Sequence, residues 1–214
     1  MKKKLLNTTV TLSLIMSSLL FTACNDTTSE AKVIEAKPVV IKKETKEETK
    51  TIYTKYDNVV NSTFKDVANL SPNGKMMLLV FGTNTNPYTD RLKADIQNSE
   101  ELTEYIKNDF SSYYLKAHEN LRHKLFHNGE LMDVDTKTML SIYAITSTPT
   151  LIFTDKEGKA VIVVPGYMPT KQFIQTIKFM KTDKWIGKDR KNGEVYEALK
   201  KFYEQNGIEI KKAQ

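Results

Sequence analysis

Hydrophobic and polar positions in the first half of the chain predict helices and strands from about residue 52. One apolar series near helical spacing predicts a helix that S-P-N-G at 71–74 ends. Its members are Tyr56, Val59, Val60, Phe64, Val67 and Leu70. M-M-L-L-V-F at 76–81 is a continuous apolar run, typical of a strand covered on both faces. Helices are predicted from about Pro87 and over 100–110, and a second strand over 111–118.

The second half predicts a helix, a hairpin and two more helices. The first helix is capped near Asp135, with inward residues Met139, Leu140, Tyr143 and Ala144. Two β-rich runs flank D-K-E-G at 155–158, which indicates a hairpin. A closing amphipathic helix over 169–180 turns an apolar side inward, formed by Phe173, Ile174, Ile177 and Met180. A Lys-rich helix over 194–205 follows, and residues 119–133 are interpreted as an ambiguous insertion.

The order of these elements predicts one α/β domain. Strand, helix, strand, helix, hairpin and helix in succession favour a mixed central sheet with helices on both faces. The composition, 40% hydrophobic and 27% charged, agrees with a globular core. The net charge of +6 falls to +3 if the three lysines at positions 2–4 leave with a targeting segment. Without a dense basic cluster, nucleic-acid binding is not expected.

The N-terminus has the layout of an export signal. M-K-K-K precedes a largely apolar stretch, and small residues precede Cys24. F-T-A-C resembles the lipobox of bacterial lipoproteins, although Phe21 stands where leucine is commoner. The resemblance implies a signal peptide over 1–23, a lipid on Cys24, and an exported protein anchored to a bacterial membrane and facing the periplasm or cell exterior. The alternative is an ordinary secretory signal with a chance cysteine.

The segment after the cysteine is predicted to be a flexible charged tether over residues 24–51. Residues 25–50 carry six acids and six lysines and no aromatic residue, so they cannot bury enough apolar surface to offset ordering. Cys24 is the chain's single cysteine. If it is acylated, the mature chain has no thiol and can neither hold nor exchange a disulfide.

Two further segments resemble one family. V-F-G-T-N-T-N-P-Y-T-D-R-L-K at 80–93 is similar to the strand, active-site turn and first helix of periplasmic thioredoxin-like proteins, where the turn reads C-P-Y-C. S-T-P-T-L-I-F-T-D-K-E-G-K at 147–159 resembles the family segment whose proline is typically cis and faces that turn. The resemblance covers about residues 52–182 and implies a thioredoxin-like fold. Residues 183–214 then form a C-terminal helical extension.

The resemblance places other residues where the family has its two cysteines. Asn86 takes the position of the nucleophilic cysteine and Thr89 that of the resolving cysteine. Thiol exchange requires a thiolate, whereas a carboxamide does not ionise and a threonine hydroxyl is a poor nucleophile without a base. The expectation is a degenerate, redox-inactive site with no catalytic residue, metal or cofactor, in a protein that is not an enzyme.

Two interpretations of N-P-Y-T remain open. Asparagine is a good helix N-cap and proline a good first helical residue, so the motif is explained fully by a well-capped helix. Alternatively, the family's peptide groove persists, with Pro87, Tyr88, Thr148 and Pro149 along it. Its main-chain groups would then hold an extended polypeptide like an added strand. That interpretation predicts a binding or chaperone-like module for exported polypeptides.

Two other functions remain open. His123 and His127 would share a face if they lay on a helix, with Glu119 and Glu130 nearby, which would allow a metal-dependent enzyme without thiol chemistry. Ordinary histidines are the favoured interpretation, because no third ligand is fixed by spacing. The protein would otherwise be an accessory subunit of a thiol-active partner protein.

Overall fold

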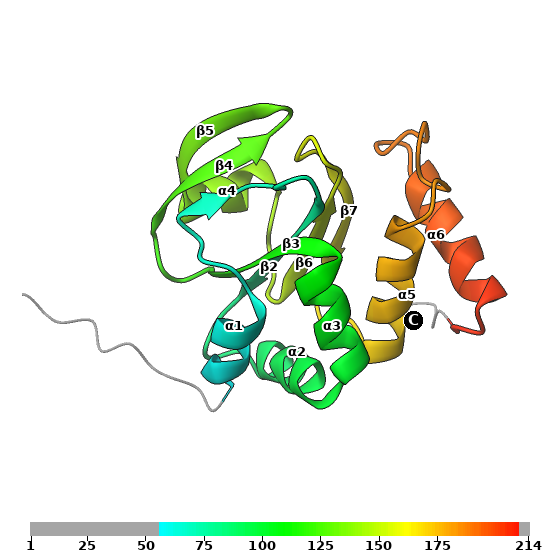
Figure 1. Cartoon of the computed structure of the whole chain (residues 1–214), viewed down its shortest axis with the longest axis horizontal. Coiled ribbons are helices and arrows are strands. Elements are labelled where there is room, and N and C mark those ends of the chain that lie inside the picture. Colours follow the sequence, from blue (N-terminus) through cyan, green and yellow to red (C-terminus); the bar gives the residue numbers. More distant parts are fainter. Residues whose placement is uncertain (1–55, 210–214) are drawn as a thin grey trace, which may run out of the picture. The chain divides into compact units, whose positions relative to one another are not determined.

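A four-stranded mixed sheet forms the centre of the fold (Figure 1). The computed structural model describes residues 56–209. The strand order is β3-β2-β6-β7, with β2 (Met76–Gly82) parallel to β3 (Phe110–Lys116) and antiparallel to β6 (Thr150–Thr154). The outer strand β7 (Ala160–Pro165) is antiparallel to β6. The run at 76–81 is therefore a central strand, as its continuous hydrophobicity predicts.

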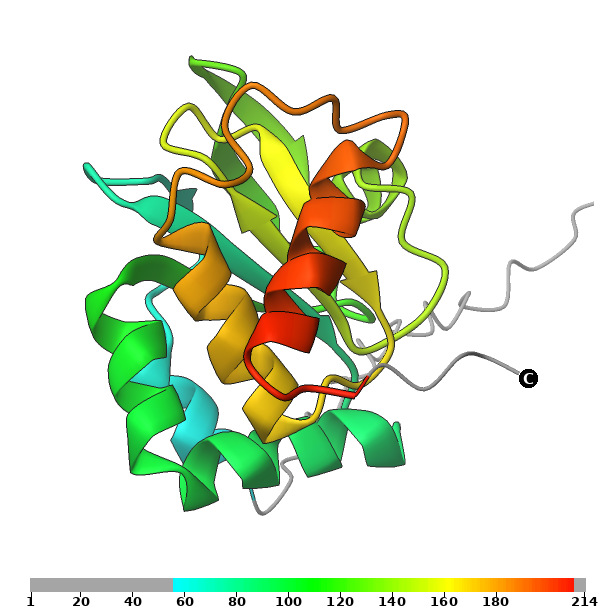
Figure 2. The ribbon, with the colours of Figure 1, turned by 90° about the vertical axis from the view of Figure 1, so that its right-hand side faces the viewer.

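Side chains of β2 alternate between two cores, because successive residues of a strand point to opposite faces. Leu78 and Val80 enter the core shared with α1 (Asp57–Thr63), α2 (Pro87–Asn98), α3 (Glu100–Asn108), α5 (Thr170–Met180) and α6 (Glu194–Gln205). Figure 2 shows α5 and α6 side by side across this layer. Met77, Leu79 and Phe81 enter the second core, with α4 (Thr136–Ile142). Helices on both faces are thus confirmed.

A second, three-stranded sheet completes the layer on the α4 side. It has the order β1-β4-β5, where β1 is Asn69–Leu70, β4 is Arg122–His127 and β5 is Glu130–Asp135. The ambiguous segment 119–133 is therefore mainly a hairpin. Its turn is Asn128–Gly129, and both residues have positive φ, 53° and 85°, which the Asn-Gly pair adopts readily.

The helix predicted over 56–70 is wrong in its second half. Helix α1 ends at Thr63, and Phe64 is extended, with φ −105° and ψ 152°. The Lys65 amide then bonds the Ser112 carbonyl of β3 at 2.9 Å, and Leu70 lies on β1. Pairing with the sheet overrides the local helical pattern. The inward position predicted for Ala144 is also wrong, because this residue lies beyond the end of α4 with φ 50° and is exposed.

The inserted hairpin is docked on the turn of the β6–β7 hairpin. The Gly129 amide donates to the Glu157 carbonyl at 2.8 Å. Gly158 lies so close to β4 that an added Cβ would stand 2.3 Å from the Phe126 carbonyl oxygen. The two turns therefore pack backbone against backbone. No helix within residues 56–209 has the length and apolar character needed to cross a membrane.

Candidate functional site

The turn between β2 and α2 is organised by one side chain. Asn86 is the N-cap of α2, and its Oδ1 accepts hydrogen bonds from the amides of Tyr88 at 2.8 Å and Thr89 at 3.3 Å. Pro87 is the first helical residue, where its missing N–H costs nothing. The N-cap interpretation of N-P-Y-T is therefore correct in its geometry.

The same side chain also reaches the loop before β6. Its Nδ2 donates to the Thr148 carbonyl at 2.8 Å and lies 3.4 Å from the Thr148 hydroxyl. The Thr148–Pro149 peptide bond is cis. Two segments separated by 62 residues thus meet at Asn86, and the residues predicted to form the site lie together. The carbonyl of Pro149 in turn accepts a hydrogen bond at 2.7 Å from the amide of Gly166, which follows β7.

The surface around this contact is partly open. Tyr88 is 58% exposed, Pro87 is exposed and Thr148 is half-buried, whereas Pro149 is buried. The Thr148 amide makes no hydrogen bond to any residue within 56–209. Within residues 56–209, the site therefore combines an exposed aromatic ring on α2 with a backbone amide, that of Thr148, which donates no hydrogen bond.

Beneath the turn lies a polar layer that sequence reasoning missed. Lys93, one turn beyond Thr89, is only 1% exposed. Its Nζ lies 3.5 Å from Asp57 Oδ1, 3.4 Å from Asn84 Oδ1 and 5.2 Å from the centre of the Tyr114 ring. Burial, with Asp57 and then Asp90 contributing, raises the pKa of Tyr114 far above its ordinary value. Lys93 is a charged residue in a predicted helix and would be expected to face solvent, so the sequence gives no signal that its side chain is buried.

Gly82 makes room for this layer. A Cβ at this position would stand 2.2 Å from the Tyr114 hydroxyl and 2.8 Å from Thr89 Cγ2. Thr89 is completely buried, and neither its hydroxyl nor that of Tyr114 has a hydrogen-bond partner in the described part of the chain. The glycine in V-F-G-T was the one sequence signal of close packing here.

This geometry agrees with comparison to known proteins. A family model for the thioredoxin-like domain matches residues 63–181, more than half of the chain. The chain belongs to this family. A solved structure of a thioredoxin-fold protein from Helicobacter pylori is 35% identical, with a TM-score of 0.64, and the match covers 69% of this chain and 94% of that one. The predicted thioredoxin-like fold is confirmed.

More distant structures are also similar to this thioredoxin-like chain. A thioredoxin from Thermus thermophilus is 12% identical over 55% of this chain and 90% of its own, with a TM-score of 0.41. An exposed lipoprotein thioredoxin from Streptococcus pneumoniae is 24% identical over 49% of this chain and 84% of its own, with a TM-score of 0.32. No functionally curated protein matches the sequence significantly.

A second surface cluster of this thioredoxin-like domain flanks the loop before β6 that contains Thr148 and Pro149, here called the proline loop. Tyr167 follows Gly166, its hydroxyl donates to Asp95, and the Arg91 guanidinium lies 4.6 Å from the centre of its ring. Burial, with Asp95 next in effect, raises the pKa of Tyr167. The contact ties α2 to the segment after β7, so both sides of the proline loop are fixed to α2.

The two candidate metal ligands, His123 and His127, lie on a strand and not on a helix. Four residues apart on β4, they are separated by about 13 Å along the strand. His123 is buried, with Nδ1 2.7 Å from the Val67 carbonyl and Nε2 2.9 Å from the Thr136 hydroxyl. In the described part of the chain, no three His, Cys, Asp or Glu side chains gather closely enough to hold a metal ion. Cys24 lies outside the described residues.

Proposed function

We propose that this protein is a redox-inactive thioredoxin-like module, exported and anchored by a lipid on Cys24, that binds extended polypeptides beside Thr148 and Pro149. One observation carries the proposal. Asn86 occupies the turn where the family resemblance places the nucleophilic thiol, and it bonds both the α2 amides and the Thr148 carbonyl. The frame of the site is therefore intact without sulfur.

The side chains at the two degenerate positions supply no chemistry that replaces thiol exchange. The Asn86 carboxamide has no ionisable proton near neutral pH, and both of its ends are engaged. The Thr89 hydroxyl is buried and has no partner within residues 56–209 that would serve as a base. A hydroxyl nucleophile requires such a base. These features support a binding role over a catalytic one.

The free groups of the site support recognition of an extended chain. The Thr148 amide is an open donor, and its carbonyl keeps one lone pair beside the bond from Asn86. A peptide lying antiparallel to this segment would pair with both groups, as in strand addition. Exposed Tyr88 would pack on its side chains. Because the described residues contain no cysteine that could trap a peptide covalently, binding is expected to be reversible.

The first test concerns redox chemistry. The full chain should show no turnover in an insulin-reduction assay, and clear turnover would refute the proposal. Replacing Asn86→Cys and Thr89→Cys together should create activity, because the turn, the helix N-terminus and the proline loop are all in place. Asn86→Cys alone is the matched control and should not complete a catalytic cycle.

The second test concerns binding. A photoreactive residue at Tyr88 should capture exported polypeptides in cells. The control is the same residue at Ile186, which is 59% exposed against 58% for Tyr88 and lies beside Met76, at the other end of β2. Equal capture at both positions would argue against a groove. Capture of a single thiol-bearing protein would favour the accessory-subunit role instead.

The anchor is tested separately. Cys24→Ser should abolish incorporation of labelled fatty acid and release the protein from the membrane, because lipid attachment requires the thioether sulfur. Unchanged labelling would contradict this part of the proposal and leave the binding role standing.

A further inference from the structure

The outer strand of the central sheet has an unusual neighbour. Strand β7 pairs with β6 on one side only, with Ile152 opposite Val163 and Leu151 opposite Val164. Its sequence, A-V-I-V-V-P, is uncharged and rich in β-branched residues. Such an edge readily pairs with another strand and is usually blunted or covered.

A tyrosine from α6 occupies the middle of this edge. The Val163 amide donates to the Tyr196 hydroxyl at 3.0 Å, and that hydroxyl donates to the Val163 carbonyl at 3.0 Å. One side-chain oxygen thus accepts and donates in the way that the backbone of a neighbouring strand would. The outward-facing groups of Val163 are satisfied without a further strand.

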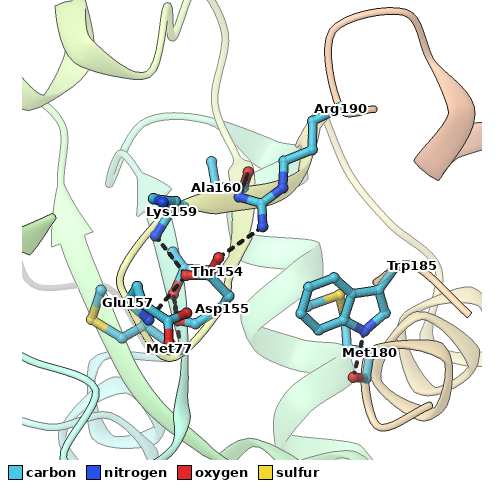
Figure 3. Close-up of polar contacts among 9 residues, drawn as sticks. All are labelled: Met77, Thr154, Asp155, Glu157, Lys159, Ala160, Met180, Trp185 and Arg190. Atoms are coloured by element: carbon cyan, nitrogen blue, oxygen red, sulfur yellow. Dashed lines mark hydrogen bonds and ion pairs between the residues drawn. The ribbon is translucent and has the colours of Figure 1, made fainter. Parts of the chain in front are cut away.

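An arginine occupies the start of the edge (Figure 3). Arg190 Nη1 donates to the Ala160 carbonyl at 3.1 Å, and Nη2 donates to Asp155 Oδ2 at 2.7 Å. Asp155 is itself fixed, because its Oδ1 accepts from the amides of Glu157 and Lys159. Arg190 is therefore held on the β6–β7 turn in a charge-assisted contact.

The segment that carries both side chains is packed against the domain. The indole of Trp185, which follows α5, donates to the carbonyl of Met180, the last residue of that helix, at 2.9 Å (Figure 3). On α6, Val195, Leu199 and Tyr203 are buried in the core shared with α5. At the far end of β7, Pro165 has no N–H to offer. The edge is thus occupied at its start and in its middle, and it lacks a donor at its end.

We propose that residues 183–205, within the C-terminal extension, act as a built-in occupant of the β7 edge that prevents this edge from pairing with β7 of a second copy. A second copy fits because antiparallel pairing of the uncharged strand with itself sets valine and isoleucine against each other and brings no like charges together. The matched family region ends at residue 181, so this device belongs to the part of the chain beyond it. The inference does not depend on the groove.

The first experiment measures amide hydrogen exchange in the full chain. Tyr196→Phe should speed exchange at Val163 by about tenfold, the effect of about one lost hydrogen bond, while Val164, which pairs toward β6, changes little. Tyr203→Phe is the control, because it removes a hydroxyl of the same helix that bonds Thr176 rather than β7. Unchanged exchange at Val163, or equal acceleration in the control, would overturn the proposal.

The second experiment measures self-association by sedimentation velocity. Tyr196→Phe combined with Arg190→Gln should produce a concentration-dependent dimer, and adding Val163→Pro should return it to monomer because proline has no donor for strand pairing. A double variant that stays monomeric at every concentration would overturn the strand-pairing step, as would a dimer that persists with Val163→Pro. If the double variant does not fold, Tyr196→Phe alone is run at the same concentrations with the same two outcomes.

Discussion

At the scale of single residues, Asn86 is the most informative position. A carboxamide has an acceptor and a donor end, and both are used: Oδ1 caps α2 and Nδ2 binds the Thr148 carbonyl. Aspartate would keep only the cap, and serine is too short to reach the second loop. This one side chain thus joins the start of α2 to the loop before β6 by hydrogen bonds.

This dual role predicts a graded effect on stability. Asn86→Ala should lower the free energy of unfolding by about 2 kcal/mol, since it removes an N-cap and an inter-loop hydrogen bond. Asn86→Ser should lose only about 1 kcal/mol, because serine still caps the helix. Urea unfolding measures both values. If the two variants are equally stable, the N-cap contributes nothing, and if Asn86→Ser is as stable as the parent chain, the bond to Thr148 contributes nothing.

At the scale of elements, helix α4 depends on its N-cap residue. Asp135 is the N-cap and accepts from the Thr138 amide at 2.7 Å. Hydrogen bonds from Thr138, and then from Asn120, lower the pKa of Asp135 from 3.8 to about 2. Because the folded state prefers the carboxylate, this contribution is present above about pH 4 and is lost as the pH falls toward 2.

Asp135→Asn tests this pH dependence with a cap that does not titrate. The stability advantage of the parent chain over Asp135→Asn should be constant from pH 7 to about pH 4 and should shrink between about pH 4 and pH 2. Urea midpoints at each pH measure the difference, since other carboxylates titrate equally in both chains. An advantage that stays constant down to pH 2 would show that Asp135 keeps its ordinary pKa.

At the scale of the whole domain, two hairpins that are distant in sequence are locked together. The β4–β5 turn and the β6–β7 turn meet through Gly129, Glu157 and Gly158, with no side chain between Gly158 and the Phe126 carbonyl. Protein interiors tolerate little added volume. The insertion is therefore expected to be a rigid part of the fold.

Two glycines with the same backbone conformation test this docking. Gly74 and Gly158 have φ of 79° and 77°, but only Gly158 has a neighbour within 4 Å of an added Cβ. Gly74→Ala should cost about 1 kcal/mol from left-handed strain. Gly158→Ala should cost about 3 kcal/mol, because displacement of the Phe126 backbone is added. Thermal unfolding compares them, and equal losses would show that the hairpins separate without penalty.

The sequence by itself determined the features that depend on neighbours along the chain. The strand at Met76–Gly82, the start of α2 at Pro87, the cap at Asp135 and the bounds of α6 all follow from local periodicity, capping and turn residues. The sequence also shows that residues 25–214 contain no cysteine, since the chain's single cysteine is Cys24.

The tertiary structure decided what depends on residues far apart in sequence. The end of α1 at Thr63, the burial of Lys93, the bond from Asn86 to Thr148 and the closing of β7 by Tyr196 each join segments that no local pattern connects. A lysine or tyrosine in a helix fits the same sequence pattern whether its side chain faces water or contacts a neighbouring strand. Only the packing of the other segments fixes their partners, because hydrogen bonding and burial are set by proximity in space.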